Sequence, residues 1–292
     1  MARAAANVSR LQLSMRIPKR NLSRIDIEYL YVNAMCALSA DEVLLSCGIY
    51  GLRVVSLHTA QLAAHEPNAI RVVYGVAFDV HTDTLLLLVW EPTNDYYQLV
   101  SLRRKASEWL EVQRLDTRIR HHSFYILNFV LCDSRVLLDG IGNSMYVFDV
   151  SAERTLRDAG NVTLKSEFRR LACTRRDGDT LVAFSHNTSV SLLRLTSLPL
   201  RLVPLASVSL SDPRQLLFRG DLLLVADWNS ANRTASIVSF RASDNELTER
   251  RVLLDALASD RVVAWAFAGD RLVLWNRRNN RKSEELLVYA FT

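Results

Sequence analysis

Arginine is the residue type with the greatest capacity for chemistry in this sequence of 292 residues. Lysine and arginine together number 36, of which only residues 19, 105, 165 and 282 are lysine, so 32 are arginine and the net charge is +5. Guanidinium groups bind carboxylates and phosphates through paired hydrogen bonds and stack on aromatic rings. An anionic partner is therefore the first functional hypothesis, although a coding bias towards Arg, Ala and Leu would produce the same excess.

Arginines also precede six recurring apolar segments, beginning with Arg24, and aromatic residues follow in the loops of the same segments. Where such segments converge, the guanidiniums would focus a positive potential suited to an acidic peptide, a phosphate or a single nucleic acid strand. With 32 arginines in the chain, chance also places one near many segments. The candidate binding residues are Arg71, Arg120, Arg169, Arg170, Arg214, Arg261 and Arg277, with Tyr50, Tyr96 and Trp228.

Oxygen ligands for a divalent cation are the second candidate chemistry. Glu91, Asp227 and Asn276 each follow an apolar run at equivalent positions, and carboxylate and amide oxygens are the ligands that Ca²⁺ and Mg²⁺ prefer. Metal-assisted hydrolysis could use such a site, but no general base accompanies the three residues. His121 and His122 are adjacent, so on a strand they would point to opposite faces and could not both ligate one metal.

Motifs of the common catalytic mechanisms do not occur. The sequence has no nucleophile elbow, no phosphate-binding loop and no dinucleotide-binding glycine motif. We therefore expect no cofactor, and a binding module is favoured over an enzyme.

The four cysteines, Cys36, Cys47, Cys132 and Cys173, are too dispersed for a disulfide framework and lack the close spacing of a zinc site. Reduced, packed thiols are expected. In a hairpin centred between residues 41 and 42, Cys36 and Cys47 would lie directly opposite each other.

These candidate residues are carried by a repeating unit. An Asp or Ser in a turn is followed by an apolar run, a polar loop and a second apolar run, and this pattern occurs six times. Each pair of runs has the length and the Val, Leu, Ile and aromatic content of a β-hairpin, with a further apolar stretch before it and a more polar one after several copies. The turn residues, Asp41, Asp83, Ser134, Asp179, Asp221 and Asp270, lie 42, 51, 45, 42 and 49 positions apart.

Four strands repeated every 40 to 50 residues are typical of a propeller blade, and six copies predict six blades. The last unit ends after three strands, while residues 8–17 offer a spare one that would complete the last blade and close the ring. A free N-terminal arm beside an open sixth blade is the alternative. The chain is thus expected to be one all-β domain, with blades at about 25–69, 70–119, 120–167, 168–212, 213–260 and 261–292.

The pattern resembles the β-propeller superfamily, with WD40-like repeats in the broad sense, over nearly the whole chain. No subfamily signature is matched, since the Gly-His and Trp-Asp dipeptides are missing and Asp227-Trp228 reverses the second of them. The resemblance implies a fold and not an activity. We expect a protein-interaction scaffold whose arginine-rich face binds an acidic partner, with nucleic acid as the variant and a metal-dependent hydrolase of the six-bladed lactonase type as the alternative.

The expected location is cytoplasmic or nuclear. No apolar run approaches the ~18 residues that span a bilayer, and the first residues lack the apolar centre of a signal peptide. No membrane partner is expected.

Overall fold

The structure is a computed structural model that describes residues 10–18, 32–48, 51–62, 72–91, 93, 95–105, 108–120, 128–139, 143–243, 246–258, 261–278 and 283–292. Within these ranges all the regular elements are β-strands. None of the described residues forms a helix long and apolar enough to cross a membrane.

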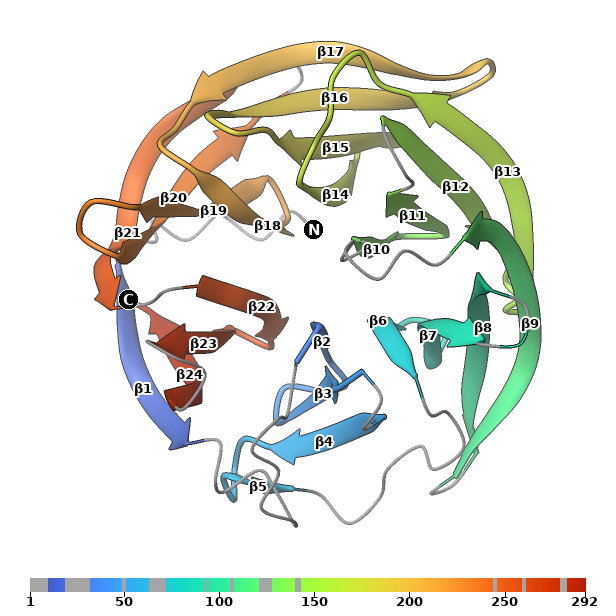
Figure 1. Ribbon diagram of the computed structural model, residues 1–292, viewed down its shortest axis with the longest axis horizontal. Coiled ribbons are helices and arrows are strands. Elements are labelled where there is room, and N and C mark those ends of the chain that lie inside the picture. Colours follow the sequence, from blue (N-terminus) through green and yellow to red (C-terminus); the bar gives the residue numbers. More distant parts are fainter. Residues whose placement is uncertain are drawn as a thin grey trace.

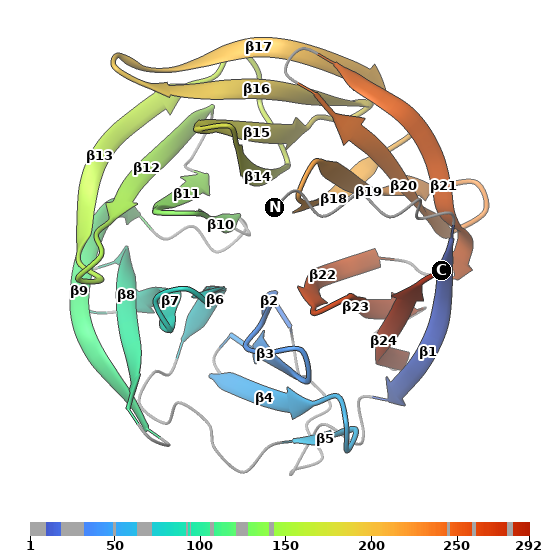
Figure 2. The ribbon, with the colours of Figure 1, turned by 180° about the vertical axis from the view of Figure 1, so that it is seen from behind.

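Six four-stranded antiparallel sheets surround a central axis, so the protein is a six-bladed β-propeller (Figure 1). In the first five blades the strands follow chain order from the axis outward, and Figure 2 shows the same ring from behind. Blade 1 contains β2 (Ala34–Ala37), β3 (Glu42–Ser46), β4 (Leu52–Ser56) and β5 (Gln61–Leu62), and blade 2 contains β6 (Val73–Asp79), β7 (Thr84–Glu91), β8 (Tyr96–Lys105) and β9 (Glu108–Arg120). Blade 3 contains β10 (Phe129–Cys132), β11 (Arg135–Asp139), β12 (Ser144–Val150) and β13 (Leu156–Thr163), and blade 4 contains β14 (Arg170–Arg176), β15 (Asp179–Ser185), β16 (Ser189–Ser197) and β17 (Leu200–Ser209). Blade 5 contains β18 (Pro213–Arg219), β19 (Leu222–Asn229), β20 (Thr234–Ala242) and β21 (Leu247–Ala258), and blade 6 contains β22 (Arg261–Ala268), β23 (Arg271–Arg278), β24 (Ser283–Phe291) and β1 (Leu11–Pro18).

The distribution of apolar residues explains this layering. The second strand of each blade is buried on both faces, as in β7, where Leu85, Leu87 and Leu88 have no exposed surface. An outer strand such as β9 alternates between exposed and partly buried residues because only one of its faces packs against the protein. Neighbouring blades thus bury each other's faces, and the hydrophobic core runs around the ring.

The N-terminal strand closes the ring, as the sequence predicted. β1 pairs antiparallel with β24, with Leu11 opposite Phe291 and Ile17 opposite Leu286, and it is the outermost strand of blade 6 (Figure 1). Backbone hydrogen bonds between Arg10 and Thr292 extend the pairing by one residue. The last blade therefore combines the two ends of the chain.

Ion pairs join neighbouring blades at one face of the ring. We call this the turn face, because it carries the turns between the first and second strands of each blade. An arginine of one blade reaches an aspartate in the turn of a neighbouring blade, and such contacts bridge blades 3 and 4, blades 5 and 6, and blades 6 and 1. The pairs are Arg175 with Asp133, Arg219 with Asp270, and Arg271 with Asp41.

The expected pairing of Cys36 with Cys47 is wrong. Cys36 lies opposite Leu44, and the partner of Ser46 is Ala34. The amides of Leu38 and Ser39 both donate to the carbonyl of Glu42, so the turn is centred one to two residues earlier than the sequence suggested. This shift moves every partner across the hairpin.

Candidate functional site

The opposite face of the ring carries the candidate site. We call it the mouth face, because the innermost strands begin there around the opening of the central channel. Arg170 begins β14 and Arg261 begins β22 at this face. Strand ends and loops hold ligand-binding side chains in many folds of this kind because a rigid scaffold positions them.

Four of the predicted residues have no described side chain. Arg71 and Tyr50 lie outside the described residues, and Arg261 and Glu91 are placed only by their positions in β22 and β7. Arg120, expected at the start of blade 3, instead ends β9, the outermost strand of blade 2.

The structure brings three predicted residues together around one aspartate. The Nη1 atom of Arg169 lies 2.7 Å from Oδ1 of Asp212, while Nε and Nη2 of Arg214 lie 2.8 and 2.7 Å from Oδ2. The guanidinium of Arg214 also stacks on the ring of Trp228, 3.8 Å from its centroid. Arg169, Asp212, Arg214 and Trp228 form what we call the Asp212 cluster, which bridges blades 4 and 5.

Asp227 holds Asp212 in position. Its Oδ1 accepts a hydrogen bond of 2.7 Å from the backbone amide of Asp212, and its Oδ2 accepts one of 3.2 Å from the amide of Ser211. Both carboxylate oxygens of Asp227 therefore bind the loop before β18. This role is positional and differs from the metal ligation that the sequence suggested for Asp227.

A second polar group adjoins the cluster from blade 3. The backbone amide of Asn128 donates to Oδ1 of Asp139 at 2.5 Å, and the Asn128 side-chain amide donates both to Asp139 and to the carbonyl of Arg169, the latter at 2.9 Å. Burial raises the pKa of the Asp139 carboxyl to about 7, and the hydrogen bonds from Asn128 and the charge of Arg170 oppose this rise. A chain of polar contacts thus runs along the mouth face from Asp139 to Trp228.

The remaining predicted residues form separate pairs within single blades. In blade 2 a hydrogen bond to the Tyr96 hydroxyl raises the pKa of the exposed Arg120. In blade 6 Nε of Arg277 lies 3.3 Å from Oε1 of Glu284, which is almost fully buried. The described arginines of the mouth face are thus split among local contacts.

The predicted metal ligands have other contacts where their side chains are described. Asn276 is fully buried and its Nδ2 lies 3.4 Å from Oε1 of Glu285 in the neighbouring strand. Among the described residues no three His, Cys, Asp or Glu side chains are placed to hold a metal ion together. The side chain of Glu91 lies outside the described part of the structure, so its approach to Asp227 and Asn276 stays a prediction.

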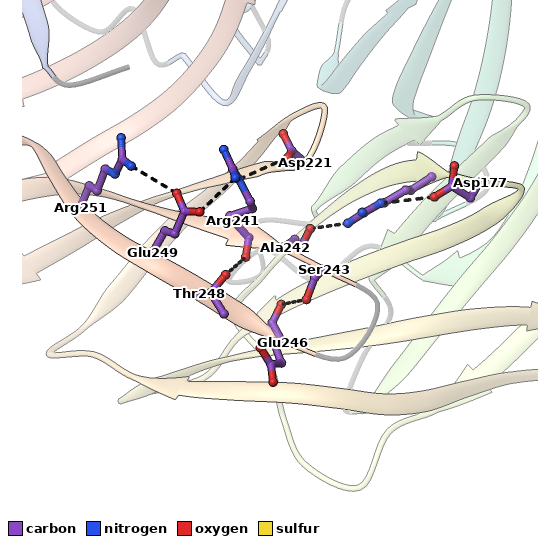
Figure 3. Close-up of polar contacts among 10 residues, drawn as sticks. Asp177, Asp221, Arg241, Ala242, Ser243, Glu246, Thr248, Glu249 and Arg251 are labelled. Carbon is purple, nitrogen blue, oxygen red and sulfur yellow. Dashed lines mark hydrogen bonds and ion pairs between the residues drawn. The ribbon is translucent and has the colours of Figure 1, made fainter. Parts of the chain in front are cut away.

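A third charged group lies in blades 4 and 5, on elements that the sequence analysis did not select (Figure 3). Arg241 lies between Asp221 and Glu249, and Glu249 also contacts Arg251 at 3.2 Å. Arg176 donates to the carbonyl of Ala242 at 2.7 Å. The charges here are paired and about two-fifths exposed, which is typical of a solvated surface network and not of an anion site.

Sequence reasoning missed Asp212, Asn128 and Asp139. Asp212 had a local signal, since an acidic residue two positions before Arg214 could be expected to contact it. Asn128 and Asp139 had none, because Asn128 contacts Arg169 across two blades and Asp139 joins the group only through Asn128.

The central channel forms a cavity beside this site. It has a volume of about 370 Å³ and is lined by the innermost strands of all six blades. Its polar lining residues are Asn33, Asn128, Arg170 and Gln215, all at or near the first residues of these strands. The mouth end of the channel is therefore polar, and the rest is mainly apolar.

Comparison with known proteins supports the fold. No protein-family model matches this sequence, and no curated protein matches it. The chain is similar to the β-propeller domain of Cps50 (Swd1) from Myceliophteria thermophila, with 12% identity and a TM-score of 0.54 over 89% of this chain and 84% of that one. It is also similar to a functionally unknown protein from Desulfotomaculum acetoxidans (12% identity, TM-score 0.61, 86% and 81% covered) and to a protein from Lactobacillus plantarum (13%, 0.58, 89% and 85%). At such identities the likeness establishes the fold alone, that of a β-propeller, and the sheet topology of this chain gives it six blades.

Proposed function

We propose that this propeller is a non-enzymatic interaction module, a scaffold within a complex, that binds an acidic segment of a partner protein at the Asp212 cluster. The observation that carries the proposal is the fixed geometry of Arg169 and Arg214. The carboxylate oxygens of Asp212 lie 2.7 Å from a nitrogen of each guanidinium, and the guanidinium of Arg214 also stacks on the ring of Trp228. Arginine side chains that are already ordered lose less entropy when a partner binds.

The charge and exposure of the cluster favour an anion. Arg169 and Arg214 of the cluster, with the adjacent Arg170, supply three guanidiniums near the carboxylates of Asp212 and of Asp227 behind it. Arg169 keeps 48% of its side chain exposed beside Asp212, so a partner carboxylate can reach it. Bonds between guanidinium and carboxylate are about twice as strong as neutral hydrogen bonds.

A binding experiment with defined probes tests this. A fluorescent peptide of Asp, Glu and Tyr is titrated with the protein at moderate salt, beside its Asn and Gln analogue and a single-stranded oligonucleotide. We expect the acidic peptide to bind and the Arg169→Gln, Arg214→Gln double variant to weaken binding about tenfold or more, because a hydrogen bond to a charged group contributes about 1.5–3 kcal/mol.

The matched control is the double variant Arg241→Gln, Arg251→Gln, which removes the same charge from the network in Figure 3. It should leave peptide affinity within about twofold at moderate salt, where distant charges are screened. Equal loss in both double variants would reduce the effect to net charge and contradict the proposal. Tighter binding of the oligonucleotide than of the peptide would favour nucleic acid as the partner.

A further inference from the structure

The wall of the central channel carries large apolar side chains as well as the polar groups at its mouth. Phe129, Val130, Leu131, Leu217 and Val263 line it and are all partly exposed there. They come from blades 3, 5 and 6. Large apolar side chains left partly exposed in a concave cavity favour a ligand with an apolar body, since binding removes them from water.

The mouth end of the same cavity supplies polar groups of one kind. Arg170 is the charged residue among the described lining residues, and these include no aspartate or glutamate. Asn33, Asn128 and Gln215 supply uncharged amides beside it. The lining therefore places amide groups and one positive charge at a single end of the channel.

The position of Arg170 is fixed. Its Nη1 donates to the carbonyl of Arg169 at 2.7 Å. The charge of Arg170 also acts on Asp139 of β11 in the neighbouring blade 3, and because the pKa of this carboxyl is raised to about 7, the carboxylate offsets the guanidinium only in part near neutral pH. The guanidinium itself stays charged at all relevant pH values. A positive charge is thus held at the mouth of the channel.

We propose that the channel binds a small amphiphile, with its apolar body between the innermost strands and a single carboxylate or phosphate group at Arg170. The volume of about 370 Å³ lies within the range of about 300–1,000 Å³ of small-molecule sites. Its polar and apolar ends match the two ends of such a molecule. A divalent cation is disfavoured in the channel itself because the described lining has no carboxylate.

This site does not depend on the proposed partner. The acidic segment contacts Arg169 and Arg214 on the rim, neither of which lines the channel. The Arg169→Gln, Arg214→Gln variant should therefore lose the acidic peptide and keep the amphiphile, so failure of either proposal is seen separately.

The test is calorimetric titration of the full chain with octanoate, octyl phosphate, octan-1-ol and octylammonium. We expect both anions to bind more tightly than the alcohol, and octylammonium to bind least. Arg170→Gln should weaken the anions about tenfold or more while leaving octan-1-ol within about twofold, because only the charged head contacts the guanidinium. Preference for one anion over the other assigns the head group.

Two kinds of variant complete the experiment. Arg176→Gln removes an arginine from the other end of the same strand, at the turn face, and should not change anion affinity. Leu217→Trp should fill the channel and abolish binding of the anions and the alcohol alike, with Val130→Phe as a second filling variant and the melting temperature as the check on folding. The proposal fails when octanoate does not bind, when octylammonium binds as well as octanoate, or when Arg170→Gln or both folded filling variants leave octanoate affinity unchanged.

Discussion

Arg271 of blade 6 contacts Asp41 of blade 1, with 2.8 Å between Nη2 and Oδ1, across the seam where the last blade meets the first. The same guanidinium donates to the carbonyl of Ala40. The chain enters blade 1 from β1, the outermost strand of blade 6, whereas β22, β23 and β24 of that blade come from the other end of the sequence. Contacts such as this one therefore join residues that are 230 positions apart in the sequence.

Removing this contact should weaken the seam slightly. Arg271→Ala is expected to lower the free energy of unfolding by about 1 kcal/mol or less, because the pair is partly exposed, with 29% and 68% of the side chains accessible. Urea denaturation measures the change. Arg251→Ala, which breaks an exposed pair within blade 5, is the control, and an equal loss in both variants would contradict a special role of the seam.

The closing strand supplies a sharper prediction, because the register shift between Leu13 and Met15 lets residues 13 and 17 differ in burial. Ile17 has no exposed surface, whereas Leu13 on the same strand is 41% exposed. Ile17→Ala should lower the free energy of unfolding by about 2–5 kcal/mol, since it leaves a cavity in the core. Leu13→Ala should stay within about 0.5 kcal/mol. Similar effects in chemical denaturation would show that β1 does not pack as described.

Stability should depend on pH through Asp139. Because burial raises the pKa of this carboxyl from 3.8 to about 7, the folded protein keeps a proton between these values that the unfolded chain has released. The stability that this group contributes therefore falls as the pH rises from about 4 to about 7, by at most about 1.4 kcal/mol per pH unit.

Urea titrations at several pH values test this slope. Asp139→Asn should flatten the decline in that window, because the side chain no longer titrates. Asp221→Asn, at an exposed ion pair on the turn face, is the matched control and should preserve the decline. The assignment of this slope to Asp139 is contradicted if the stability of the wild-type protein falls across this window no more than the stability of Asp139→Asn.

Gly75 allows blades 2 and 3 to approach each other. A Cβ atom at this position would lie 2.7 Å from Cβ of Phe129 in β10, too close to be relieved by rotating the ring. Gly75→Ala is expected to cost about 1–3 kcal/mol of folding free energy, as overpacking does. In a double-mutant cycle Phe129→Ala should recover part of this loss, and strictly additive effects would exclude the contact.

Much of the fold could be predicted from local patterns. Apolar runs such as residues 85–88 are buried on both faces, and turn residues recurring every 42 to 51 positions mark the blades. The last repeating unit lacks one strand, and a spare strand precedes the first unit. Together they predicted that β1 closes the ring, because a propeller must pair its last edge. The fine register was less accessible, since Cys36 pairs with Leu44 after a turn whose centre local composition does not define.

The candidate site, like the fold, could be predicted from the sequence only in part. The sequence by itself determined that arginines and aromatics recur with the blades, because residue identity and a regular period suffice for this, but it assigned Arg120 to blade 3 and not to blade 2. Only the tertiary structure decided that Arg169 and Arg214 share Asp212, that Arg277 contacts a buried glutamate, and that Asp139 is buried beside Asn128. Arg169 and Asp212 are separated by 43 residues, and which charges meet across blades depends on how the sheets pack and how much water remains between them.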